Sequence, residues 1–128
     1  MNSTQAAAIY VGVNIALLVF LGARVVGRRR SAQVSVGDGG DATLNLRIRT
    51  HGNASEYIPA FLVGLFMTAS LGLAVWGVHA LGAVFTFGRV LHAIGLSGTV
   101  MPARAFGMIL TWLPMLAVAG LLVWQALT

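Results

Sequence analysis

Apolar residues form four long segments along the 128-residue chain, separated by short stretches that hold most of the charged and turn-forming residues. The segments cover about residues 5–27, 42–76, 78–97 and 103–127. A helix needs about 20 apolar residues to cross the hydrocarbon layer of a membrane. The pattern therefore predicts four transmembrane helices, and the second is long enough that its first turns are expected to project from the membrane.

Several residues predict where these helices start, end and bend. The stretch RRRSAQVSVGDGGDAT, between the first two segments, is rich in Gly and Ser and is typical of a loop. Either Asp41 or Thr43 is expected to cap the second helix by accepting from a free backbone N–H. Pro102 is expected to start the fourth helix. Pro59 predicts a kink in the second helix, because its ring lacks an N–H and crowds the carbonyl of Ser55.

The composition agrees with a membrane protein. Hydrophobic residues make up 58% of the chain and charged residues 9%, against about 25% charged in an ordinary soluble domain, which excludes a water-soluble globule. We expect a single all-α domain spanning residues 1–128. The first segment could imitate a signal peptide, but MNSTQ before it has no basic residue, so we expect a retained helix. The absence of cysteine excludes a disulfide framework and a thiolate metal site.

The positive charges predict how the chain is oriented. All eight basic residues are arginines, and they border the apolar segments instead of forming one polar face, which argues against nucleic acid as a partner. Six of them gather around the first loop and two flank the third connection: Arg24, Arg28, Arg29, Arg30, Arg47 and Arg49, then Arg89 and Arg104. The positive-inside rule places both connections in the cytoplasm and both termini outside.

Small residues recur at helical spacing on two of the predicted helices. They are Gly64, Thr68 and Gly72 on the second, and Gly107, Thr111 and Gly120 on the fourth. Such residues let membrane helices approach closely. Glycine is also simply common in membrane helices, so close packing at these positions remains one of two interpretations.

A group of polar residues interrupts the apolar pattern at the start of the second segment. Arg49, Asn53 and Glu56 share one helix face, with Tyr57 beside them. Each charge at the centre of a membrane helix costs about 2.5 to 3.5 kcal/mol, so such residues need partners. A ligand site is the favoured interpretation, and an interhelical network that sets packing is the alternative.

A shorter polar stripe lies on the third predicted helix. Arg89 and His92 are three residues apart, near the same predicted cytoplasmic end, and Arg104 follows the next turn. If the helices pack together, several arginines surround a partly buried carboxylate and amide, which suits a small polyanionic ligand. The arginines of the first loop are more simply explained as topology determinants and contacts to lipid headgroups. No metal site is predicted.

Three motifs resemble one membrane-protein family. The pattern R-x-H-G-N-x-x-E-Y-x-P-x-F-L, from Arg49 to Leu62, resembles the second-helix signature of the membrane-associated proteins in eicosanoid and glutathione metabolism, the MAPEG superfamily. GRVLHAIG, residues 88–95, is similar to its third-helix motif, and RAFGMILTW, residues 104–112, to the start of its fourth helix. The length of the chain is similar to that of the short bacterial branch.

The resemblance implies a fold, a ligand and site residues. It implies a homotrimer of four-helix bundles that binds glutathione between neighbouring subunits, near the cytoplasmic face. The implied glutathione contacts are Arg29, Arg49, Asn53, Glu56, Tyr57, Arg89 and His92. Arg104 is the implied catalytic residue, because a guanidinium close to the thiol favours the thiolate. One departure is that this chain has His92 and Leu96 where the well-studied eicosanoid enzymes have tyrosines.

These observations give three functional hypotheses. The first is a membrane-bound glutathione transferase or peroxidase acting on lipophilic electrophiles or hydroperoxides, in a multi-pass protein of a bacterial inner membrane. The second is a non-catalytic scaffold of the same fold that holds a lipid or glutathione. The third is a small transporter or pore, which is disfavoured because the charges gather at one end and leave the other half of the second helix apolar.

Overall fold

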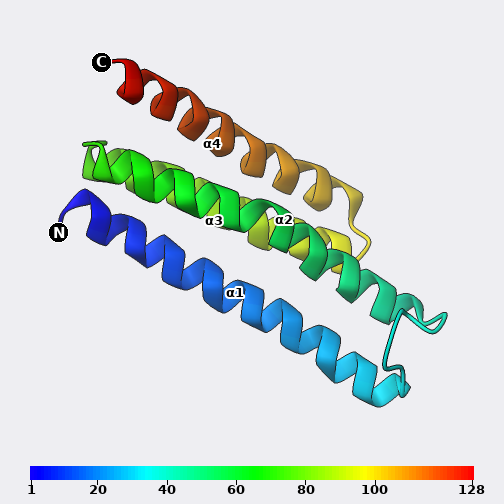
Figure 1. Cartoon of the computed structure of the whole chain (residues 1–128). Helices are drawn as coiled ribbons and strands as arrows, with labels where there is room; N and C mark the ends of the chain where they lie inside the picture. Colours follow the sequence, from blue (N-terminus) through cyan, green and yellow to red (C-terminus); the bar gives the residue numbers. More distant parts are fainter.

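The computed structural model describes all 128 residues as a bundle of four helices (Figure 1). They are α1 (Ser3–Ala32), α2 (Ala42–Ser70), α3 (Val75–Ser97) and α4 (Met101–Leu127). Successive helices run in opposite directions, so both termini lie at one end, here called the terminal end, together with the α2–α3 turn. The α1–α2 loop and the α3–α4 connection lie at the other, here called the loop end. Helices α2 and α3 form the middle, and α1 and α4 do not touch each other.

Three of the four helices are long and apolar enough to cross a membrane. These are α1, α3 and α4, with mean hydropathies of 2.2, 1.4 and 2.1 over their most apolar windows. Helix α2 does not meet the same criterion, because its first half carries Arg47, Arg49 and Glu56. The prediction of membrane-spanning helices is thus supported for α1, α3 and α4, and a crossing by α2 stays a prediction.

The turn between α2 and α3 corrects the predicted helix boundaries. The second helix was expected to reach residue 76, but it ends at Ser70, and α3 starts at Val75 instead of residue 78. Gly72 causes the break, since its φ of +97° lies in the left-handed region that favours glycine. The N–H of Leu73 then donates to the carbonyl of Thr68 at 3.0 Å and closes the turn.

The first helix extends beyond its predicted range of 5–27 at both ends. At its start the side chain of Asn2 accepts from the N–H of Gln5, whose own side chain accepts from the N–H of Asn2, so the pair forms a capping box. At its end the helix continues through the arginine run to Ala32, because arginine is a good helix former whether or not it is in lipid.

The start of α2 is fixed by Asp41, one of the two predicted capping residues. Its carboxylate accepts from the N–H of Leu44 at 2.6 Å, and it also pairs with both Nε and Nη2 of Arg28, at 3.1 and 2.5 Å. The bond from Arg28 and the bond from Leu44 lower the pKa of Asp41. A carboxylate at a helix start also interacts favourably with the helix dipole. Asp41 therefore joins the end of α1 to the beginning of α2.

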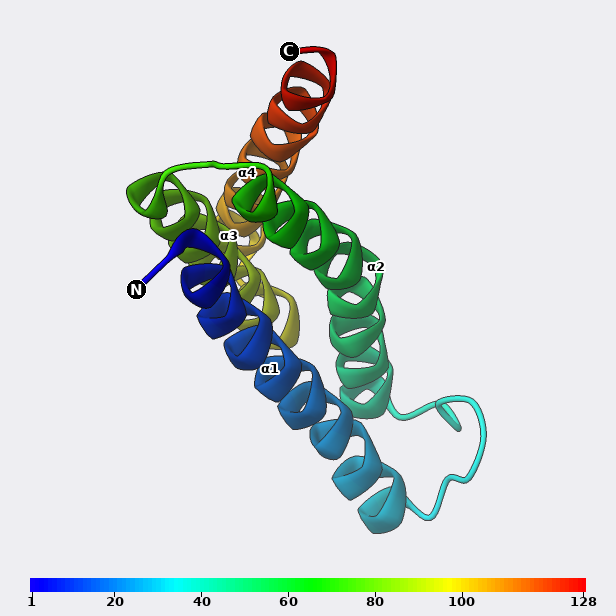
Figure 2. The same ribbon diagram turned by 60° about the vertical axis from the view of Figure 1, so that its left-hand side comes forward.

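Two of the three prolines, Pro102 and Pro59, lie in the helices to which the sequence pattern assigned them. Pro102 is in the first turn of α4, as expected. Pro59 lies inside α2, and Figure 2 shows that α2 changes direction along its length. Pro114 lies inside α4 and is buried.

The apolar core lies between α1, α2 and α3. Its centre is a stacked pair of rings, Phe61 from α2 and Phe85 from α3, whose centroids are 3.7 Å apart. Toward the terminal end, a buried polar cluster links α1 to α3: Asn14 donates to Thr86 at 2.8 Å, and the hydroxyl of Tyr10 lies 2.9 Å from Nδ1 of His79. The pairing of α1 with α3 thus combines apolar contact with directional hydrogen bonds.

Glycines let α3 and α4 pack with their backbones in contact. A Cβ on Gly107 would lie 2.5 Å from the backbone nitrogen of His92, and one on Gly88 would lie 2.7 Å from Cβ of Leu110. A Cβ on Gly95 would collide with the backbone of Arg104. This close approach places the last turns of α3 directly against the first turns of α4.

The predicted small-residue positions divide into two groups. Gly64 and Gly107 are closely approached by Val118 and His92, and Thr68 and Thr111 are fully buried. Gly72, however, lies in the turn after α2, and Gly120 has no atom within 4 Å of a Cβ built on it. Close packing is therefore confirmed at the first four positions and is wrong for the last two.

The difference between Gly107 and Gly120 gives a matched test. Gly107→Ala should destabilise the protein by about 1–3 kcal/mol, because the new methyl group has to push α3 away from α4. Gly120→Ala should be neutral or stabilising, since alanine is the better helix former by up to about 1 kcal/mol. Unfolding in mild detergent by added dodecyl sulfate, followed by helical circular dichroism, measures both. Equal stability of the two variants would contradict the proposed close approach.

The structure of the loop end should depend on pH. Because the pKa of Asp41 is lowered in the folded protein, its contribution is complete above the ordinary aspartate pKa of about 3.9 and is lost as the pH falls through the lower folded value. The protection factor for hydrogen exchange at the N–H of Leu44, which corrects for the slower intrinsic exchange of an exposed amide in acid, should therefore fall below that pH.

Asp41→Asn is the control for this pH dependence, because asparagine keeps the cap but has no charge for Arg28. It should expose the loop at neutral pH and weaken the acid response. The acid response that remains in the variant is expected to come from Asp38, whose pKa is lowered by the hydrogen bond from the N–H of Gly40. A variant with the same acid response as the parent protein would rule out the Arg28–Asp41 pair as its source.

Candidate functional site

A polar cavity of about 410 Å³ opens at the loop end, between α2, the end of α3 and the start of α4. Binding sites for small molecules usually measure about 300–1,000 Å³. Ten residues line this one: Asn45, Leu46, Ile48, Arg49, Gly52, Asn53, Glu56, His92, Leu96 and Arg104. Most of the wall is polar, in a bundle whose other outer surfaces are largely apolar.

Helical spacing explains why α2 supplies most of the wall. Asn45, Arg49 and Asn53 are spaced by four residues, and Arg49, Gly52 and Glu56 by three and four, so all five lie on one face of the helix. The predicted stripe of Arg49, Asn53 and Glu56 is therefore one continuous surface, and it faces the cavity along its length.

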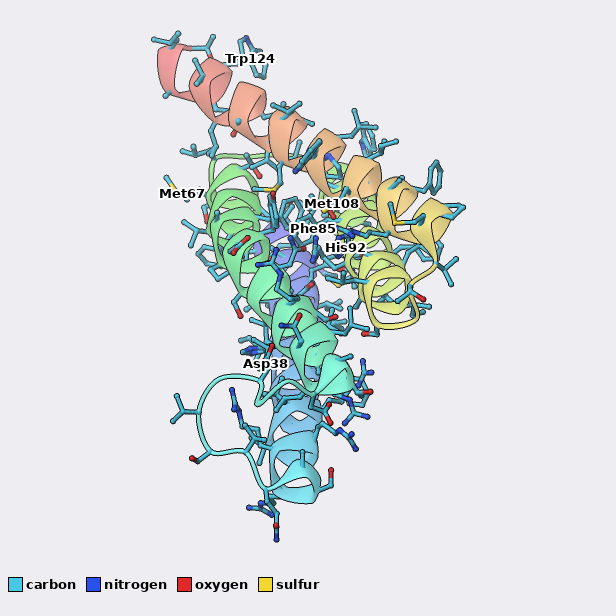
Figure 3. All side chains as sticks on the ribbon, turned by 90° about the vertical axis from the view of Figure 1, so that its right-hand side faces the viewer. Asp38, Met67, Phe85, His92, Met108 and Trp124 are labelled. Atoms are coloured by element: carbon cyan, nitrogen blue, oxygen red, sulfur yellow. The ribbon has the colours of Figure 1, made fainter.

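The opposite wall comes from the α3–α4 junction. His92 and Leu96 lie one turn apart on α3, and Arg104 lies in the first turn of α4. The glycine contacts of α3 with α4 bring these residues to the same place, since Gly95 touches the backbone of Arg104 and Gly107 that of His92. Figure 3 shows His92 in the space between α2 and the α3–α4 pair.

The charged residues of the cavity have no ion-pair partners within the chain. The chain has a single ion pair, Arg28 with Asp41, which lies in the α1–α2 loop region. Arg49, Glu56 and Arg104 are exposed to the cavity and to solvent, two positive groups and one negative. Such an arrangement can bind a ligand that carries both anionic groups and an ammonium group.

Arg89 lies behind the cavity and not in its wall. Its side chain is 1% exposed. Its Nη2 donates to Oδ1 of Asn53 at 2.7 Å, and its Nη1 donates to Oγ1 of Thr111 at 3.2 Å. The guanidinium also lies over the ring of Tyr57, at 5.5 Å from the centroid. One side chain of α3 thus binds both α2 and α4.

Tyr57 and Arg29 also lie outside the cavity. Tyr57 lines a neighbouring apolar groove with four residues of α4: Trp112, Met115, Leu116 and Ala119. Arg29 lies at the end of α1 and donates to the carbonyl of Gly37 at 2.7 Å, which holds the α1–α2 loop. Of the eight predicted site residues, the structure therefore brings five into one cavity: Arg49, Asn53, Glu56, His92 and Arg104. Their proposed roles stay predictions.

Several residues of the site region escaped prediction as site residues, and three of them shape its polar chemistry or its space. Asn45 precedes Arg49 by four residues on the same face, so the helical spacing alone could have identified it. Gly52 lies on that face too, and it leaves room for the cavity because it has no side chain. Thr111 was noted only as a small residue, and no pattern within α4 indicates that it accepts from Arg89.

Taken together, the apolar helices and the charged cavity at one end define a helical membrane protein with a polar cavity at the end of its bundle. The chain belongs to the MAPEG family, whose sequence model matches residues 7–124.

Curated relatives support this assignment. The chain is 37% identical over 109 residues to the inner membrane protein YecN of Escherichia coli strain K12, an alignment that covers 85% of this chain and 83% of the relative. The protein of the same name from E. coli O6:H1 strain CFT073 matches to the same extent. The family resemblance of the three motifs is thereby confirmed.

Proposed function

We propose that this member of the MAPEG family binds glutathione in the cavity at the loop end and uses it as a co-substrate against lipophilic electrophiles or hydroperoxides. The observation that carries the proposal is that Arg49, Glu56 and Arg104 surround one cavity without ion-pair partners in the chain. Charged groups near hydrocarbon are costly unless they are paired, which favours a ligand that completes them.

The chemistry of glutathione fits these charges. The tripeptide carries two carboxylates, which suit the guanidinium groups of Arg49 and Arg104, and one ammonium, which suits the carboxylate of Glu56. Its thiol has to lose a proton before it can act as a nucleophile. Arg104 is the proposed catalytic residue, because a guanidinium beside the sulfur stabilises the thiolate.

A lipophilic second substrate has a route to this site from the bilayer. The apolar groove lined by Tyr57, Trp112 and Met115 lies between α2 and α4, beside the cavity. Tyr57 also contacts Arg89, which binds Asn53 in the cavity wall. A membrane concentrates apolar substrates along such a groove, so proximity contributes to the rate.

We further propose a homotrimer in a bacterial inner membrane, with the loop end in the cytoplasm. The distribution of arginines supports this orientation, since most lie toward the loop end. The exposed apolar side chains of α4, including Leu113, Leu116 and Val123, support contacts with lipid and with neighbouring subunits. Arg29 would then contact glutathione only as part of a neighbouring subunit.

A non-catalytic scaffold is the second candidate. It is favoured by Leu96, whose aliphatic side chain lines the cavity and offers no hydrogen bond to a thiol. A scaffold would hold glutathione or a lipid without turnover.

Glutathione binding to the purified protein tests the site. Isothermal titration should detect binding at up to millimolar ligand, and Arg49→Gln or Glu56→Gln should weaken it by about tenfold to a hundredfold, because each removes a charged hydrogen bond. Arg30→Gln is the matched control, since it removes an arginine that lies outside the cavity. No binding to the parent protein would exclude the proposed function, and unchanged binding in both cavity variants would exclude the site.

The role of Arg104 has a spectroscopic test. Bound glutathione should show thiolate absorbance at neutral pH, and Arg104→Gln should abolish it while Arg104→Lys retains part of it. Turnover with a generic electrophile should follow the same order. Binding that occurs without thiolate or turnover in the parent protein would favour the scaffold.

A further inference from the structure

Arg89 controls the hydrogen-bonding character of the inner cavity wall, although it does not reach the cavity. Four acceptor atoms surround its guanidinium: Oδ1 of Asn53 at 2.7 Å, Oγ1 of Thr111 at 3.2 Å, Nδ1 of His92 at 3.5 Å and Sδ of Met108 at 3.8 Å. A guanidinium has five N–H donors, accepts nothing and keeps its proton. Every group that faces it must therefore present a lone pair.

This requirement fixes the orientation of the Asn53 amide. Its oxygen faces Arg89, so its NH₂ group has to point the other way. Nδ2 has no hydrogen bond within the chain and is not among the buried unpartnered atoms, so it is open to the cavity that Asn53 lines. Asn53 consequently presents donors, and no acceptor, to a ligand.

The same requirement fixes the tautomer of His92. Because Nδ1 faces the guanidinium, it carries the lone pair, and the ring holds its single proton on Nε2. His92 is only 2% exposed, but it lines the cavity, and its Nε2 has no hydrogen bond within the chain and is not among the fully buried atoms that lack one, so we infer that Nε2 is the atom that faces the cavity. His92 therefore presents a donor as well.

We propose that Arg89 is a positioning residue that fixes Asn53 and His92 as donors toward the cavity, and that with Arg104 they form a donor-only wall for an anionic group of the ligand. The ammonium group of the ligand is left to Glu56, the single carboxylate of the cavity. This rests on the proposed binding of glutathione, whose thiolate and glycine carboxylate are the two anionic groups far from its ammonium group. The third, the glutamyl α-carboxylate, is on the same carbon as the ammonium and is therefore placed with it on the Glu56 side of the cavity.

A purely structural role for Arg89, as a link between α2, α3 and α4, makes a different prediction. It requires the hydrogen bonds but is indifferent to which ring nitrogen of His92 carries the proton. The tautomer is therefore the informative measurement, and the 128-residue chain contains three histidines, His51, His79 and His92.

The first experiment is nitrogen-15 NMR of histidine-labelled protein in lipid nanodiscs without ligand, with signals assigned by the variant His92→Gln. His92 should have its proton on Nε2. Arg89→Gln should give a mixture of tautomers, because glutamine both donates and accepts, and Arg89→Lys should restore the single tautomer. A proton on Nδ1 in the parent protein would overturn the proposal even if Arg89→Gln fails to fold. A single Nε2 tautomer in a folded Arg89→Gln variant would overturn it too.

The second experiment exchanges the donor of Asn53 for an acceptor. Asn53→Asp keeps an oxygen for Arg89 and gains an ion pair, but it turns a second oxygen toward the cavity. The donor wall predicts at least tenfold weaker glutathione binding in a variant that remains folded, whereas a structural role predicts unchanged binding.

Two analogues identify the anionic group on the wall. S-methylglutathione has no thiolate, and the glycine monoethyl ester of glutathione lacks that carboxylate. If the wall holds the thiolate, Asn53→Asp should not weaken the binding of S-methylglutathione. If the wall holds the glycine carboxylate, Asn53→Asp should not weaken the binding of the monoethyl ester. A penalty unchanged for both would overturn the donor wall. If the parent protein binds no glutathione, the proposed function fails, and the tautomer still decides the positioning role of Arg89.

Discussion

A guanidinium inside a membrane bundle needs several acceptors at once, because neither water nor lipid can solvate it there. Arg89 has no carboxylate in contact, and its charge is met by the amide oxygen of Asn53, the hydroxyl of Thr111 and the ring of Tyr57. These partners come from α2 and α4, while Arg89 itself is on α3. The three helices therefore have to converge around one side chain. The cavity lies in front of it, with Asn53 and His92 between Arg89 and the cavity interior.

Backbone contact between α3 and α4 makes this convergence possible. Thr111 is close enough to accept from Arg89 because the neighbouring glycine, Gly107, lets α4 approach His92 directly. The hydrophobic effect does not drive helix association in lipid, so close packing and interhelical hydrogen bonds have to supply the stability. The same contact delivers Arg104 to the cavity, because Gly95 lies against its backbone. Packing and site geometry therefore have a common origin in a few residues without side chains.

Much of this arrangement could be predicted from the sequence, because helical periodicity is a local property. The face formed by Arg49, Asn53 and Glu56, the cap at Asp41 and the start of α4 at Pro102 follow from spacing and residue type alone. The end of α2 could not be predicted in this way. The apolar run continues through the turn, and hydropathy does not indicate that Gly72 adopts a left-handed φ. The position of Arg89 behind the wall could not be predicted either. The burial of Arg89 depends on how closely α2, α3 and α4 pack together, and the sequence of α3 alone does not determine that distance.

The mixed character of α2 affects how the protein is made. Helices α1, α3 and α4 are apolar enough to enter a membrane on their own, whereas α2 carries the polar half of the site and falls short of them. A segment of this kind that crosses a bilayer is held there by its neighbours more than by its own partitioning. The tight turn after Ser70 couples α2 to the more apolar α3, so the two can be released from the insertion machinery as one hairpin. The polar residues by which α2 lines the cavity are thus the same ones that leave it dependent on α3 if it is to cross the bilayer.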